Sequence, residues 1–109
     1  MAFDEQLGNR LRDMLSPLDS VTEKKMFGGL CFLYKGKMVC GVVKDDLVFR
    51  IQSPYYESVL TEVHMRPMDF TGKVMKEFIF AAPQAFADEQ SLNRLVEYGL
   101  QHARSKLTK

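Results

Sequence analysis

Two cysteines and two histidines are the residues of this 109-residue chain that most directly suggest metal or acid–base chemistry. Cys31 and Cys40 are separated by eight residues, and His64 and His102 are far apart in the sequence. Neither pair therefore has the close spacing that is typical of a zinc site. His102 is expected on the polar side of the last helix, near the end where a cation is favoured. The sequence predicts no metal site and no cofactor.

The cysteines also suggest redox chemistry, because both lie in the stretch KMFGGLCFLYKGKMVCG, residues 25–41. A two-residue turn at Lys35-Gly36 would pair Cys31 with Cys40 across a β-hairpin, with Cα atoms ~4.5 Å apart. That distance is at the short end of the range for a disulfide. We expect two reduced, buried thiols, with a redox pair as the alternative.

Two adjacent glycines, Gly28 and Gly29, raise the possibility of a phosphate-binding loop. The segment LCFLY that follows them is typical of a strand, whereas a phosphate loop precedes a helix. A bulge or bend between two strands is therefore the favoured interpretation. No nucleophile motif of the GxSxG type occurs, and turn chemistry explains Asp45 and Asp46. The motifs indicate no catalytic residue, although they leave an enzyme open.

Two arginines are candidate contacts for an anionic group. Arg50 interrupts the apolar run DLVFRI, and Arg66 lies in the segment HMRPMDFTGK. Either side chain could bind an anion in a pocket between a sheet and the last helix. The alternative is that the arginine stem covers apolar surface while its charged head reaches water.

The elements that must position these residues follow from the periodicity of the apolar residues. Leucines at helical spacing predict a first helix that Pro17 ends: Leu7, Leu11, Leu15 and Leu18. Residues 21–52 change to a period of two, and turn residues separate four strand-like runs: VTEKKMF, LCFLY, KMVCGVV and DLVFRI. A short helix is predicted to follow, with Ser53 as its N-cap and Pro54 as its first residue.

The rest of the chain adds one strand and one helix. We interpret HMRPMDFTGK as a loop and VMKEFIFAA as a fifth strand, and the last helix is predicted from Asp88 to about Lys106. The order α-β-β-β-β-α-β-α predicts an α+β fold with a five-stranded antiparallel sheet flanked by helices. At this length we expect a single domain over residues 1–109.

Composition and charge narrow the classes of function. The chain is 46% hydrophobic and 27% charged, as is usual for a globular protein, and its formal net charge is +1. This balance does not support nucleic-acid binding. No signal peptide or membrane span is evident, so a cytoplasmic protein without a membrane partner is expected.

Both faces of the predicted sheet are apolar. With a two-residue turn at Lys35-Gly36, one face carries Leu30, Phe32, Tyr34, Val39 and Val43, and the other carries Cys31, Leu33, Met38, Cys40 and Val42. The second face then needs a helix or a partner to cover it. We therefore expect a protein-interaction module that forms a homodimer or binds a protein partner.

Several segments in this order resemble the TfoX/Sxy family N-terminal domain: MFGGL, the K-DDL turn, RPMDFTG and the final helix ending in GLQHARS. The resemblance implies a standalone, secretion-chaperone-like domain from a bacterial regulator related to the competence regulator TfoX/Sxy. It supplies no catalytic residue. The positions that match the family are expected to be structural: Met26, Phe27, Gly28, Gly29, Arg66, Pro67, Asp69 and Phe70.

Overall fold

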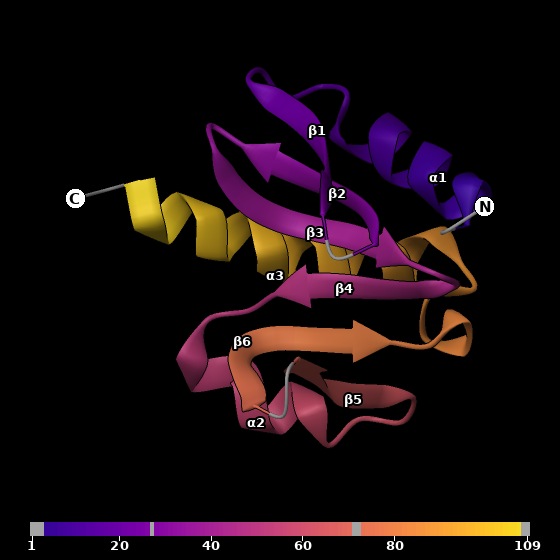
Figure 1. The fold of residues 1–109 in the computed structure, drawn as a ribbon, viewed down its shortest axis with the longest axis vertical. Coiled ribbons are helices and arrows are strands. Elements are labelled where there is room, and N and C mark those ends of the chain that lie inside the picture. The colour runs from indigo at the N-terminus through magenta and orange to yellow at the C-terminus, as the bar shows by residue number, and fades with distance from the viewer. Residues whose placement is uncertain (1–3, 27, 71–72, 108–109) are drawn as a thin grey trace.

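A six-stranded antiparallel sheet with three helices forms the fold (Figure 1). The computed structural model describes residues 4–26, 28–70 and 73–107, with the side chains at 26, 68–70 and 73–76 left aside. The elements are α1 (Glu5–Leu15), β1 (Val21–Met26), β2 (Gly29–Tyr34), β3 (Lys37–Val43), β4 (Asp46–Arg50), α2 (Ser53–Leu60), β5 (Met65–Phe70), β6 (Lys73–Ala81), the 3₁₀ turn η1 (Pro83–Phe86) and α3 (Glu89–Leu107). The predicted α+β class is confirmed.

The sheet has one strand more than the sequence predicted. Its strand order is β1-β2-β3-β4-β6-β5, so β5 is an edge strand. The segment interpreted as a loop contains β5, and Pro67 lies within that strand. Proline is tolerated on an edge strand because its missing N–H can face outward. The prediction of five strands was therefore wrong by this edge strand.

The helices pack on one face of the sheet. In Figure 1, α3 passes behind β3 and β4. The main core is formed by side chains from α1, α2, α3 and the covered face of the sheet, and its largest fully buried members are Phe32, Phe49, Leu7, Leu11 and Leu15. Among the described residues, no helix is long and apolar enough to cross a membrane.

The opposite face is apolar and is already buried within the chain. Its cluster contains Cys31, Met38, Val48 and Phe78, none more than 8% exposed. The large hydrophobic residues that are exposed in the described part, Tyr55, Val63 and Leu107, lie elsewhere. Burial of these four side chains thus does not require a partner chain.

A bulge in the β2–β3 hairpin changes which side chains share a face. The predicted turn at Lys35-Gly36 is confirmed, because Tyr34 pairs with Lys37. The register then shifts, since Leu33 pairs with Met38 but Phe32 pairs with Cys40. The extra residue turns the rest of β3 over, so Cys40 and Val42 join the core under the helices, whereas Val43 packs with the opposite face.

Two glycines allow close approach or unusual backbone geometry. Gly28 has φ +73° in the connection between β1 and β2, a region where residues other than glycine are strained. Gly99 brings α3 so close to β3 that a Cβ atom there would lie 2.1 Å from the Val39 carbonyl oxygen. Gly99 consequently sets the depth at which α3 sits on the sheet.

Candidate functional site

Arg50 is the last residue of β4 and lies where the chain leaves the sheet for α2. Its guanidinium carbon is 4.3 Å from the centre of the Phe78 ring, and 22% of its side chain is exposed. The Nε atom is buried and has no hydrogen-bond partner among the described residues. Burial lowers the pKa of Arg50, and the nearby Glu77 carboxylate opposes that shift. Arg50 is therefore a partly desolvated cation with unused hydrogen-bond donors.

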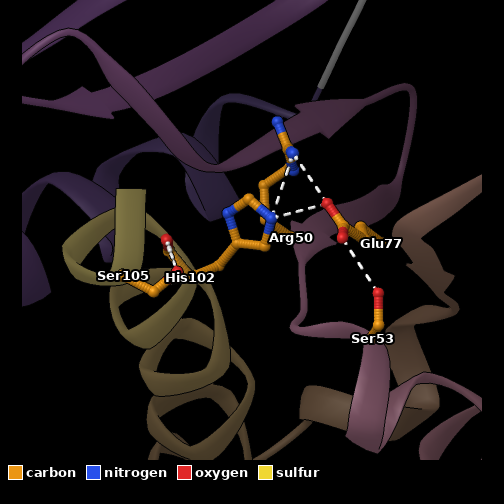
Figure 2. Close-up of polar contacts among 5 residues, drawn as sticks. All are labelled: Arg50, Ser53, Glu77, His102 and Ser105. Carbon is orange, nitrogen blue, oxygen red and sulfur yellow. Dashed lines mark hydrogen bonds and ion pairs between the residues drawn. The ribbon is translucent and has the colours of Figure 1, made fainter. Parts of the chain in front are cut away.

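Glu77 supplies the carboxylate beside this cation (Figure 2). Its Oε1 accepts a hydrogen bond from His102 Nε2 over 2.9 Å and lies 3.4 Å from an Arg50 terminal nitrogen, while its Oε2 accepts from the Ser53 hydroxyl over 3.0 Å. The bond from His102 is the main reason that the Glu77 pKa falls to about 2, and the Ser53 bond adds to it. Glu77 is therefore ionised at neutral pH.

His102 reaches this cluster from α3 and is only 2% exposed. Its predicted place on the polar side of the helix was wrong, because the side chain faces Arg50 and Glu77 instead of solvent. Burial lowers its pKa, so the ring is neutral at neutral pH. When Nε2 carries the proton and donates to Glu77, the same atom cannot accept from Arg50, 3.1 Å away. The cluster leaves Arg50 incompletely satisfied.

A surface pocket of about 300 Å³ opens beside this cluster. It is lined by Gly36, Lys37, Met38, Arg50, His102 and Lys106. Three of these side chains are cations, and Glu77 is the anion that contacts one of them. The pocket thus lies between the β2–β3 turn, the end of β4 and the last turns of α3, and its charge favours an anion.

The predicted alternative pocket between the sheet and the last helix agrees with this position for Arg50 but not for Arg66. Arg66 is on β5, its side chain is 52% exposed, and it forms an ion pair with Asp46 at 2.5 Å. Its guanidinium carbon lies 4.8 Å from the centre of the Phe80 ring. Arg66 does not line the pocket that contains Arg50.

The cysteines do not form the predicted cross-strand pair. Cys31 pairs with Gly41, and Cys40 pairs with Phe32, so the two thiols belong to the clusters on opposite faces of the sheet. Both are free and buried. Burial raises the pKa of both thiols, that of Cys31 to about 11. The register on which the redox pair depended is absent.

The residues that match the family are spread along one strand end and one edge strand. Met26 ends β1, Gly28 lies in the connection, Gly29 begins β2, and Arg66, Pro67, Asp69 and Phe70 lie in β5. A Cβ atom on Gly29 would lie 1.9 Å from the Val42 carbonyl oxygen, which is a structural requirement for glycine. Phe27 and the side chains of Met26, Asp69 and Phe70 lie outside the described part. Within that part, no three histidine, cysteine or acidic residues converge as a metal site would require.

Sequence reasoning missed Glu77, Lys37 and Lys106 as members of the site. Glu77 had one usable signal, because it is a lone acid before the apolar segment FIFAA. His102 had another, because it lies three residues after Gly99, and residues three apart share a side of a helix. No signal in the sequence places Lys37 and Lys106 in the site, because the hairpin and the end of α3 meet only in the folded chain.

Comparison with known proteins yields one match. Residues 13–103 match the family model of the TfoX N-terminal domain, which covers most of the chain. No curated protein and no solved structure matches.

Proposed function

This chain belongs to the TfoX N-terminal domain family, and we propose that it is a non-enzymatic bacterial, cytoplasmic regulatory domain that binds a small anionic molecule. The proposed site is the pocket of Lys37, Arg50, His102 and Lys106. The family suggests a regulator related to the competence regulators, while the pocket supplies the chemistry. Such a regulator would respond to the binding of the anion and would not convert it chemically.

One observation carries the proposal, the unused bonding capacity of Arg50. A guanidinium has five N–H donors, and a carboxylate or phosphate normally takes two of them at 2.7–2.9 Å. Arg50 has instead a 3.4 Å contact with Glu77 and a buried Nε without a described partner. An anion in the pocket would accept hydrogen bonds from the terminal nitrogens of the Arg50 guanidinium, and the neighbouring lysines would add attraction.

The test is the effect of inorganic phosphate on thermal stability, with potassium chloride at equal ionic strength as the reference. Phosphate that binds only the folded chain stabilises it by about 2.7 kcal/mol at about 100 times its dissociation constant. We expect a rise in melting temperature for the wild type and for Arg66→Gln, and none for a folded Arg50→Gln variant. Arg66→Gln is a matched control because it also removes an arginine that stacks on a phenylalanine beside a carboxylate. Equal shifts in all three proteins would refute the site.

A second candidate function, protein contact, is favoured by the two edges of the sheet. β5 carries Pro67, which lacks an N–H, whereas β1 has no proline and carries the charged residues Glu23, Lys24 and Lys25. Charged side chains also discourage pairing at an edge, but unlike proline they leave the backbone N–H groups of β1 available to a strand of another chain. We therefore propose β1 as the contact strand of a homodimer or of a complex with a protein partner. Light scattering at ~100 µM should show dimers if the partner is a second copy with micromolar affinity; a monomer that also binds no protein in affinity purification would refute this candidate.

A further inference from the structure

Glu77 already brings to Arg50 the negative charge that a bound anion would bring. Its carboxylate contacts both Arg50 and His102, which line the pocket, but it does not itself line that pocket. We propose that Glu77 is a built-in competitor that holds Arg50 while the pocket is empty, and that an incoming anion displaces it. This inference rests on the proposed anion binding and concerns how that binding is regulated.

The contact between the two side chains is loose enough to be replaced. At 3.4 Å it is longer than the 2.7–2.9 Å of a strong ion pair, and it uses one terminal nitrogen of the guanidinium. Both side chains are partly exposed, 22% for Arg50 and 28% for Glu77, so water and ions reach them. A phosphate that binds Arg50 through two donors would therefore have an advantage over Glu77.

The backbone at Glu77 indicates that this placement has a cost. Its φ is +75°, a left-handed conformation that is strained for a residue other than glycine. The β5–β6 register jumps here, since Pro67 pairs with Ile79 and Met68 pairs with Met75, which leaves Glu77 in a bulge of β6. Bulges re-aim side chains, often next to functional sites. Here the bulge aims a carboxylate at Arg50.

Displacement of Glu77 would reach α2 through Ser53. The Ser53 hydroxyl donates to Glu77 Oε2, and Ser53 is the first residue of α2. The residue before it, Gln52, makes no side-chain capping bond, so Glu77 is the carboxylate that restrains this helix end. If Glu77 moves away from Arg50 when an anion binds, its hydrogen bond with Ser53 would break. We therefore expect anion binding to loosen the first turn of α2.

The experiment compares phosphate affinity in the wild type, Glu77→Gln and Glu97→Gln by calorimetric titration at neutral pH and low salt. Removal of a competing charge about 4 Å from the bound anion should tighten binding by about tenfold or more. Glu97→Gln is the control, because it removes the same charge from an exposed site on α3 that does not line the pocket. Hydrogen exchange is the second measurement, and phosphate should speed exchange at the start of α2 in the wild type but not in Glu77→Gln.

The outcomes separate this inference from the proposed function. If phosphate binds the wild type and Glu77→Gln equally well, the competitor role is wrong, while the anion site stands. If neither folded protein binds phosphate, the anion site itself is wrong, and the competitor role falls with it. Should Glu77→Gln fail to fold, Ser53→Ala replaces it, because loss of the restraint on Glu77 should tighten binding severalfold, and unchanged affinity would contradict the proposal.

Discussion

Arg50 and Arg66 occupy similar positions on the sheet but have different surroundings. Each lies over a phenylalanine of β6, with Phe78 below Arg50 and Phe80 below Arg66, and each has a carboxylate nearby. Arg66 is half exposed and has a short ion pair with Asp46. Arg50 is more buried, and its contact with Glu77 is long.

This difference shows why only one of the two is a candidate site. An exposed ion pair such as that of Arg66 contributes about 0–1 kcal/mol, and water can satisfy the remaining donors of a side chain that is 52% exposed. A partly buried guanidinium with unused donors is costly to leave unsatisfied, so a ligand that satisfies it gains affinity. Residue type alone did not separate the two arginines, but burial and hydrogen bonding do.

The close packing of α3 on β3 should have the largest effect on the surroundings of Arg50. Gly99→Ala would place a Cβ atom 2.1 Å from the Val39 carbonyl oxygen, so α3 must move away from β3. We expect unfolding free energy to fall by about 3 kcal/mol, at the upper end of the cost of overpacking. Because His102 lies one turn after Gly99, the shift should also disturb the Arg50 cluster and weaken phosphate binding, while Arg66 is unaffected. Urea denaturation and phosphate titration measure the two effects.

Gly8→Ala is the matched control for that substitution. A Cβ atom at Gly8 in α1 would meet Leu30 Cδ2 at 3.6 Å, which is an ordinary contact, and alanine is the better helix former by about 1 kcal/mol. We expect Gly8→Ala to be neutral or stabilising. If Gly99→Ala is equally well tolerated, α3 is not held by this close approach, and the depth of His102 has another cause.

Sequence patterns predicted the α+β class because periodicity reports which side of an element is apolar. They missed β5 because Pro67 argues against a strand, and only the strand order shows that this strand is at an edge. They also misplaced Cys40, because no residue type in the hairpin predicts the bulge that shifts the register between Phe32 and Leu33. Local pattern was sufficient for the elements and insufficient for their register.

The site was less predictable than the fold, because its residues come from four elements. Arg50 was identified as a charge in an apolar strand, and in the structure it lines a pocket together with His102 and Lys106 of the last helix. Ser53 was predicted as an N-cap, yet Gln52 holds that position and the Ser53 hydroxyl bonds to Glu77 instead. Such bonds depend on how β6 and α2 pack, which single-sequence periodicity does not report.

The pH dependence of stability is a smaller effect, and it should depend on the residues around Arg50. The pKa of His102 is lowered by burial, so below about pH 6.5 the unfolded chain takes up that proton first and stability falls. The pKa of Glu77 is lowered to about 2, so its contribution is present above about pH 4.3 and is lost as the pH falls toward 2. For Glu77 we expect about 1 kcal/mol, because its carboxylate is partly solvated.

Urea denaturation from pH 7 to 3 would assign these two parts to their residues. His102→Gln should flatten the dependence between pH 7 and 5, and Glu77→Gln should flatten it below about pH 4.3. Arg66→Gln should keep the wild-type profile between pH 7 and 5, because Arg66 contacts neither His102 nor Glu77 in the described structure and its partner Asp46 is a carboxylate that titrates in more acidic solution. A wild type that instead gains stability from pH 7 to 5 would mean that Glu77 holds His102 as a cation. Arg50 would then share the Glu77 carboxylate with a second positive charge. The pocket would be more positive in acid, and it would attract an anion more strongly.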